Sequence, residues 1–81
     1  MELQEKFEMA IKKVKTKSPS DQIRLKLYGL YKQIVFGDCK EAKPWSYQIE
    51  KCYKWQSWKD NKCMSIEKCM TIYIAIVEKL N

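Results

Sequence analysis

Apolar residues recur with helical spacing in four segments of the chain. In the first segment, which we place over residues 2–14, they lie one to four positions apart, at Leu3, Phe7, Ala10, Ile11 and Val14. An α-helix completes a turn in about 3.6 residues, so this spacing puts these side chains on one face. The polar run at residues 15–20 interrupts the pattern. The sequence therefore predicts a first amphipathic helix that ends near Val14.

The second segment predicts a helix over residues 21–36 with defined boundaries. Either Ser18 or Ser20 can cap its first turn, because a serine oxygen accepts from a free backbone N–H there. Pro19 suits a first helical turn, where its missing N–H costs nothing. Gly37 can adopt the left-handed conformation that ends many helices.

Two further helices are predicted after a loop that runs over residues 38–44 or a little beyond. The third helix begins after Ser46 and ends near Asn61. The fourth has Ser65 as its N-cap and Glu67 in its positively polarised first turn. Its apolar face continues to the C-terminus through Ile66, Cys69, Met70, Tyr73, Val77 and Leu80. Only two glycines and two prolines occur among 81 residues, so we expect an all-α fold, a four-helix bundle.

The helix over residues 21–36 carries two apolar faces instead of one. Projected at about 100° per residue, one stripe faces the predicted core and consists of Ile23, Leu27, Leu30 and Ile34. The opposite stripe, which should be polar, consists of Leu25, Tyr28, Tyr31 and Val35, with Arg24 and Lys32 beside it. This second face either packs on another helix or binds a ligand through its aromatic rings and a lysine that donates to a phosphate.

A second group of aromatic and basic residues lies in the predicted third helix, in the motif Lys54-Trp55-x-x-Trp58. The two indoles share a helix face. Core packing, with the aliphatic stem of Lys54 passing alongside, accounts for at least one of them, and we assign that role to Trp58.

The charge balance favours an anionic partner. Sixteen Lys and Arg face ten Asp and Glu, for a formal net charge of +6. Nucleic acid, a membrane surface and a phosphate-bearing small molecule would all fit, although many small domains are basic without any such partner. The chain contains no histidine, which excludes Ser/His and Cys/His nucleophiles and a Cys₂His₂ zinc site.

The four cysteines, Cys39, Cys52, Cys63 and Cys69, form no Cys-x-x-Cys pair, so the usual zinc and thioredoxin-type spacings are missing. The first residues contain no apolar stretch that could serve as a secretory signal. We therefore expect a cytoplasmic protein with reduced thiols. No apolar run approaches the ~20 residues that cross a bilayer.

Four blocks of the sequence occur together in one register: Tyr28-Gly29-Leu30-Tyr31-Lys32-Gln33, then Gly37-Asp38 with Pro44, then Lys54-Trp55-x-x-Trp58, then Ser65-x-Glu67-x-x-Met70-x-x-Tyr73-Ile74 with Val77-Glu78. In these blocks the sequence resembles the acyl-coenzyme A-binding proteins. The spacings hold from Pro19 to Glu78 without a gap. Phe7, Ala10 and Val14 also look like the family's first helix.

This resemblance implies a single acyl-CoA-binding domain over residues 1–81, folded as an up-down-down-up four-helix bundle. It implies an open groove for the adenine-ribose-phosphate head, with the fatty chain sheltered between the protein and the folded ligand. The expected function is non-catalytic binding and transport of long-chain acyl-CoA esters by a cytoplasmic monomer without a cofactor. Transient contacts with membranes or with enzymes that use acyl-CoA are compatible with it.

The resemblance also implies roles for individual residues. Tyr28, Lys32 and Lys54 would hold the ribose 3′-phosphate. Tyr31 and Tyr73 would line the pocket for the head group.

Three further positions complete the expected site. Leu25 would lie against the adenine. Lys15 or Lys17 would close the positive wall, and the choice stays open because the segment over residues 15–18 is shortened and rearranged relative to the family.

Three departures from the family pattern affect the groove more than the fold. Arg24 replaces a long apolar residue, where it could stack on adenine or donate to a phosphate. Ile34 replaces alanine, so the neighbouring core must accommodate a larger side chain. Trp45 replaces a small residue after Pro44 and could change the rim above the acyl chain.

Two other classes of function compete with the carrier. A helical module could present the Tyr28, Tyr31 and Lys32 face to nucleic acid or to a protein. Against nucleic acid, the lysines are spread over all four segments and Arg24 is the only arginine, whereas base readout in the major groove relies on arginine. An enzyme is disfavoured because no acid/base constellation or phosphate-cradling glycine loop is present.

Overall fold

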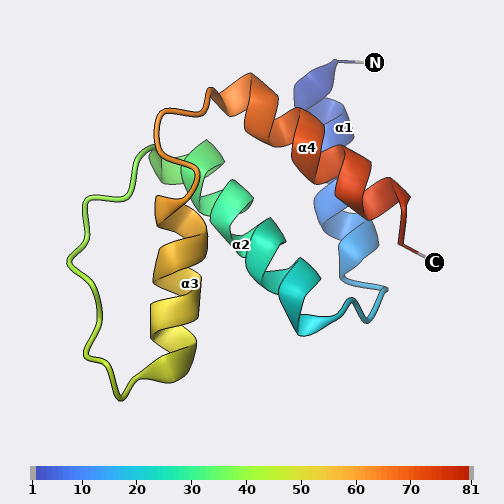
Figure 1. Ribbon diagram of the computed structural model, residues 1–81. Coiled ribbons are helices and arrows are strands. Elements are labelled where there is room, and N and C mark those ends of the chain that lie inside the picture. Colours follow the sequence, from blue (N-terminus) through green and yellow to red (C-terminus); the bar gives the residue numbers. More distant parts are fainter. Residues whose placement is uncertain (1, 81) are drawn as a thin grey trace.

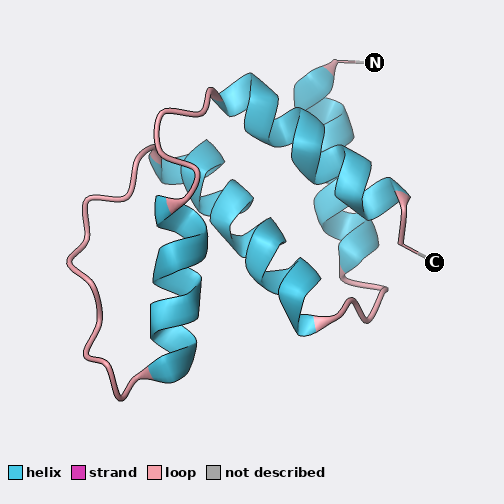
Figure 2. Ribbon diagram, viewed as in Figure 1, coloured by secondary structure: helices cyan, strands magenta, loops and turns pink. Residues whose placement is uncertain are grey.

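Four α-helices form where the apolar spacing predicted them (Figure 1). The computed structural model describes residues 2–80, so Met1 and Asn81 of the expected 1–81 domain lie outside the described residues. The helices are α1 (Leu3–Val14), α2 (Asp21–Phe36), α3 (Ile49–Lys59) and α4 (Ile66–Glu78). Loops connect them, and residues 2–80 contain no strand (Figure 2). None of these helices combines the length and the apolar character needed to span a membrane.

The helix boundaries follow from local chemistry. Ser20, and not Ser18, caps α2 by accepting from the backbone N–H of Ile23 at 3.4 Å, so Pro19 precedes the helix and does not form its first turn. Ser65 caps α4 by accepting from Lys68 at 3.1 Å. Gly37 ends α2 with a φ of 80°, a value that disfavours side chains other than glycine's hydrogen.

The third helix is shorter than the sequence predicted. It begins at Ile49 and ends at Lys59, whereas the pattern placed it between Ser46 and Asn61. At its start, the backbone N–H of Gln48 donates to the carbonyl of Trp45 at 2.8 Å, so these residues form a separate turn.

The helices pack in a row in the order α1, α4, α2, α3. Within residues 2–80, the backbones of α1 and α4, of α4 and α2, and of α2 and α3 lie side by side, and no other helix pair brings its backbones this close. Figure 1 shows α2 between α3 and α4, with α1 behind α4. In that view α1 and α4 run in one direction and α2 and α3 in the other, which is the predicted up-down-down-up arrangement. The Cα atoms span 41 × 27 × 14 Å, so the molecule is flat.

One apolar cluster joins α1, α2 and α4. Its members are Phe7, Ala10, Leu27, Leu30, Ile34, Cys69, Met70, Tyr73 and Val77. The stripe of α2 that was predicted to face the core therefore does so, and Ile23 packs against its edge. Cys39, Cys52, Cys63 and Cys69 are all free thiols.

The last helix pair makes its contact through backbone. A Cβ atom at Gly29 of α2 would overlap the carbonyl oxygen of Ser57 in α3, so only glycine allows this approach. Asn61, 2% exposed, donates to the same Ser57 carbonyl at 3.1 Å. Trp58 is the one buried residue of α3, as predicted.

The long loop before α3 is attached by the two tryptophans. The indole N–H of Trp58 donates to the carbonyl of Gly37 at 2.8 Å. That of Trp55 donates to the carbonyl of Glu41 at 2.8 Å. The Lys-Trp-x-x-Trp motif thus holds the loop against α3 and leaves Lys54 free to face α2.

Candidate functional site

Three hollows in the surface meet at the ring of Tyr28, which lines all of them. The Tyr73 hollow has a volume of about 420 Å³ and lies between the end of α1, α2 and α4. Its functional side chains are Lys15, Lys17, Arg24, Tyr28, Tyr31 and Tyr73. No carboxylate is among its lining residues, so the charges that surround it are positive.

The second and largest space is the Leu25 hollow, about 830 Å³, between α2 and α3. Leu25, Ile49 and Tyr53 supply its apolar walls. Its charged rim is mixed and consists of Asp21, Arg24, Glu50 and Lys54. This hollow is suited to an apolar group more than to a concentrated negative charge.

The third space, the Trp55 hollow, is about 220 Å³ and lies where α3 meets the long loop. Pro44 and Glu41 border it on the loop side, and Lys54, Trp55 and Trp58 on the helix side. Since Lys54 also lines the Leu25 hollow, the two spaces share a cation as well as the Tyr28 ring.

Two ammonium groups from different helices lie over that ring. The Nζ atom of Lys32 is 5.7 Å from the centroid of Tyr28, and that of Lys54 is 5.6 Å away. Lys32 also lies over Phe36 at 4.6 Å and Trp58 at 5.3 Å. Aromatic faces attract cations and hold these flexible side chains in place. The result is a pair of positive charges beside a phenol.

Lys54 has a carboxylate partner. Its Nζ atom is 3.3 Å from Oε1 of Glu50, one turn earlier on α3; the Glu50 side chain is largely exposed and the Lys54 side chain partly exposed. An exposed pair of this kind contributes little stability. Lys54 can therefore exchange Glu50 for an anionic ligand at small cost.

In the Tyr73 hollow, Tyr73 is only 5% exposed, and its ring meets Phe7 edge-on with centroids 5.0 Å apart. Burial raises the pKa of Tyr73, and the neighbouring Tyr31 raises it further. The phenol is therefore neutral at physiological pH and able to donate a hydrogen bond.

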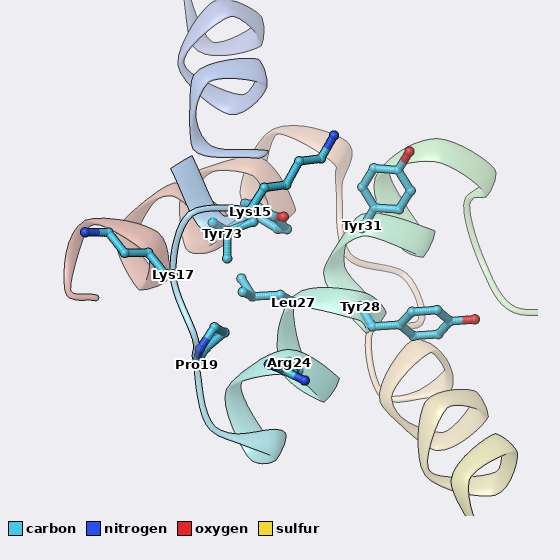
Figure 3. A pocket seen from close by; sticks show the side chains of 9 residues that line it. Lys15, Lys17, Pro19, Arg24, Leu27, Tyr28, Tyr31 and Tyr73 are labelled. Carbon is cyan, nitrogen blue, oxygen red and sulfur yellow. The ribbon is translucent and has the colours of Figure 1, made fainter. Parts of the chain in front are cut away.

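Figure 3 separates the two candidate lysines of the segment after α1. Lys15 extends toward the side on which Tyr31 lies, whereas the ammonium group of Lys17 points away from Tyr31 and Tyr73. Both residues line the Tyr73 hollow. The geometry favours Lys15 for contact with a group bound beside Tyr31.

The structure brings most of the predicted site residues together and divides the others. Tyr31, Tyr73, Lys15 and Lys17 line the Tyr73 hollow, while Leu25 lines the Leu25 hollow on the α3 side. Leu25 is thus apart from the tyrosines with which the resemblance grouped it. Lys32 is not among the lining residues of any of the three hollows, and it approaches them through Tyr28.

The sequence-based site omitted residues that the structure adds. Arg24 lines both the Tyr73 and the Leu25 hollows; the sequence marked it as a departure that could stack on adenine or donate to a phosphate, but did not include it among the expected site residues. Ile49 and Tyr53 line the Leu25 hollow, but their one-turn spacing on α3 reads equally well as an ordinary helix face. Trp45, expected at the rim, is 73% exposed and lines none of the three hollows.

The second face of α2 is half-buried at Leu25 and Tyr28 and open toward its C-terminal end. Tyr31 is 40% and Val35 50% exposed, so no helix covers them. Among residues 2–80, no three His, Cys, Asp or Glu side chains gather in a way that could hold a metal ion.

Comparisons with known proteins agree with the fold and the motifs. The family model described as Acyl CoA binding protein matches residues 4–77. An acyl-CoA-binding protein of Dictyostelium discoideum is 45% identical over 76 residues, which cover 91% of this chain and 90% of the relative.

Solved structures extend this similarity to the backbone. The crystal structure of Acyl-CoA-Binding Protein 2 of Oryza sativa superimposes with a TM-score of 0.91 at 38% identity, over 98% of this chain and 90% of its own. The solution structure of an acyl-CoA-binding protein of Babesia bovis has a TM-score of 0.84 at 32% identity, over 99% and 93%. The family model and the relatives together span nearly all of the sequence and show that the chain belongs to the acyl-CoA-binding protein family.

Proposed function

We propose that this protein binds long-chain fatty acyl-CoA esters in the groove formed by the three hollows around Tyr28, and carries them without chemical change. One observation supports this most directly. Lys32 and Lys54 come from different helices, yet both ammonium groups lie within 6 Å of the same phenol ring. This cluster offers a phosphate two cations and a hydroxyl donor, so Tyr28, Lys32 and Lys54 would hold the ribose 3′-phosphate.

The rest of the nucleotide head would occupy the Tyr73 hollow, beside the 3′-phosphate. Its lining residues include cations from two elements and no carboxylate, which suits the negative charge of the pyrophosphate. Tyr31 and Tyr73 would contact the head group, and Tyr73 would donate a hydrogen bond. Lys15 would form the positive wall, with Lys17 at its outer edge.

The acyl chain would occupy the Leu25 hollow. Its walls of Leu25, Ile49 and Tyr53 are apolar, and its volume is about twice that of the Tyr73 hollow. Leu25 would then contact the tail or the junction with the adenine rather than lie deep in the head-group pocket. Arg24, which lines both hollows, would face the pyrophosphate that links head and tail.

The energetics of such a ligand divide naturally between the two ends. Each CH₂ removed from water contributes about 0.8 kcal/mol. A hydrogen bond to a charged group contributes about 1.5–3 kcal/mol, or one to two decades in Kd. The phosphate would thus select CoA, and the tail would select long chains.

The remaining features of the proposal concern the protein as a carrier. A cytoplasmic monomer that binds without a cofactor suits an open groove of this size. The exchange partners would be membranes and the enzymes that produce or consume acyl-CoA esters. The sequence contains a single arginine, Arg24, which argues against nucleic acid as a partner.

Calorimetric titration tests the proposal. Purified protein is titrated with palmitoyl-CoA below its micelle concentration, and separately with free CoA and with palmitate. We expect one-to-one binding of the ester and much weaker binding of each half. If the ester does not bind, the carrier function is wrong, and the Tyr28 surface should be screened against proteins and RNA.

A further inference from the structure

Large apolar side chains gather at one corner of the molecule, where the long loop meets the start of α3. Trp45, Tyr47, Ile49 and Tyr53 are 73%, 77%, 63% and 60% exposed. We call these four residues the aromatic corner. Other exposed apolar residues, such as Met9 at 56% and Ile66 at 51%, lie on separate helices. The corner therefore concentrates exposed apolar surface within nine consecutive positions of the chain.

The corner is held in place by several hydrogen bonds, so its exposure reflects a defined conformation. The carbonyl of Trp45 accepts from the backbone N–H of Gln48 at 2.8 Å and from the thiol of Cys52 at 3.4 Å. The backbone N–H of Cys52 donates to the carbonyl of Gln48 at 3.0 Å. Ile49 and Tyr53 lie one turn apart on α3 and share a face. Figure 1 shows this junction projecting from the lower edge of the molecule, remote from both termini.

The chain on both sides of the corner carries an excess of positive charge. Residues 40–54 contain four lysines and two glutamates, and Lys40, Lys43 and Lys51 are exposed. The whole chain carries a formal charge of +6. Exposed aromatic rings with lysines nearby in the chain are complementary to a surface that has an apolar interior and an anionic outer layer.

We propose that the aromatic corner inserts into the headgroup region of an anionic lipid bilayer. Tryptophan and tyrosine favour the membrane interface because their rings are apolar and their N–H and O–H groups remain hydrated. Basic side chains near the surface add attraction to anionic lipids, and stable attachment normally needs both contributions. A protein partner would more readily be expected at a concave or flat site than at a projecting tip.

The aromatic corner shares residues with the proposed acyl-chain site, which links the lipid contact to ligand exchange. Ile49 and Tyr53 belong both to the corner and to the wall of the Leu25 hollow. Insertion of the corner would therefore bring one wall of that hollow to the lipid surface. An apolar chain could then pass between bilayer and groove with little exposure to water. The lipid contact itself does not require the protein to bind acyl-CoA.

Vesicle flotation tests the proposal with full-length protein. The probes are vesicles of equal parts phosphatidylcholine and phosphatidylserine, and vesicles of phosphatidylcholine alone. The test variant carries Trp45→Ser and Tyr47→Ser, two exposed residues that line none of the hollows. The matched control carries Met9→Ser and Ile66→Ser, which remove exposed apolar surface elsewhere.

We expect wild type and the control to bind the anionic vesicles, and the test variant to bind about tenfold more weakly. Added salt should weaken binding, as should the absence of phosphatidylserine. Equal affinity of the test variant and wild type would overturn the proposal, as would no binding of wild type to either vesicle. Circular dichroism checks that both variants retain their helix content.

Two further measurements locate the contact and separate it from the ligand groove. Brominated lipid in the vesicles should quench wild-type tryptophan emission, and Trp45→Phe should remove most of that quenching. Undiminished quenching in this variant would exclude insertion of the corner. In solution without vesicles, the Trp45→Ser, Tyr47→Ser variant should bind palmitoyl-CoA as wild type does. Failure of acyl-CoA binding in both proteins would therefore overturn the carrier function and leave the lipid contact standing.

Discussion

At the scale of single residues, the site depends on cations that are positioned by aromatic rings. Lys32 lies over three rings and Lys54 over one. A long lysine side chain loses substantial rotamer freedom when it is fixed. Here both ammonium groups already lie beside Tyr28 in the free protein, so a phosphate would bind to donors that are close to their bound positions.

The first prediction concerns these donors. Lys54→Ala or Lys32→Ala should weaken palmitoyl-CoA binding at least about tenfold, because one charge-assisted contact is lost, while helix content stays unchanged. Removal of the ligand's 3′-phosphate should lower the affinity of wild type strongly and the affinity of the lysine variants much less. Lys68→Ala, which removes an exposed lysine of α4, serves as the control. Calorimetry measures these affinities. If removal of the phosphate lowered the affinity of wild type and of the variants equally, the proposed role of the two lysines would be wrong.

Asp38 is a second residue whose charge the structure uses. Its Oδ1 atom accepts from Nε2 of Gln33 at 2.7 Å and from the backbone N–H of Cys63 at 2.8 Å. The hydrogen bond from Gln33, followed by that from Cys63, holds the pKa of Asp38 below its usual value near 3.8. The carboxylate thereby joins the end of α2 to the turn before α4.

This linkage predicts a specific acid dependence of stability. Because the pKa of Asp38 is lowered in the folded state, its contribution is complete above the unfolded pKa and disappears as pH falls through the folded pKa. Asp38→Asn should therefore be less stable than wild type at neutral pH, with a difference that shrinks in acid. Urea unfolding as a function of pH measures this, with Asp60→Asn, at the exposed residue that follows α3, as control. A constant difference at all pH values would contradict it.

At the scale of elements, α3 is attached to the rest by few but specific contacts. Its backbone approaches α2 at Gly29, and Trp58 is its only buried side chain. This close approach sets the width of the Leu25 hollow, whose walls come from α2 and α3. The glycine is therefore expected to affect ligand binding as well as packing.

Gly29→Ala tests that consequence. Alanine raises helix propensity by up to about 1 kcal/mol, yet its Cβ would overlap the Ser57 carbonyl and force the helices apart. We expect net destabilisation of about 1–3 kcal/mol, typical of overpacking, together with weaker binding of the acyl chain. Urea unfolding and palmitoyl-CoA titration measure the two effects. A stabilised variant would mean that α2 and α3 can separate freely.

At the scale of the whole molecule, the row of helices explains where the groove lies. Phe7, Leu30, Val77 and their neighbours tie α1, α4 and α2 into one core, and α3 is added at the end of the row. A flat molecule leaves the second face of α2 uncovered at Tyr31 and Val35. The groove thus follows the boundary between a stable core and a helix with a single neighbour.

This arrangement predicts unequal local stability. Amide hydrogen exchange should be faster in α3 than in the central turns of α2 and α4, because α3 can open without disrupting the core. Saturating palmitoyl-CoA should slow exchange in α3 more than in α1, since a ligand held between α2 and α3 stabilises only the closed form. Mass spectrometry of peptides from each helix measures this. Equal protection of α1 and α3 by the ligand would contradict the proposed place of the acyl chain.

Much of this fold could be predicted from the sequence, because helices and their caps are encoded locally. The spacing of Leu27, Leu30 and Ile34 determined which face of α2 enters the core. The Ser65 cap and Gly37 determined two boundaries to the residue. The surplus aromatic stripe with Tyr28 and Tyr31 indicated a surface that the bundle does not need for packing.

Other features were decided only by the tertiary structure, because they depend on residues distant in the chain. Periodicity cannot tell that Lys32 and Lys54 reach the same ring, that Leu25 and Tyr73 lie in different hollows, or that Arg24 borders both. The spacing of apolar residues did not reveal the turn before α3. There the backbone N–H of Gln48 donates to the carbonyl of Trp45, so the helix begins only at Ile49. The sequence by itself determined the helices and the residues available for a site. The packing order of those helices decided which of these residues share one groove.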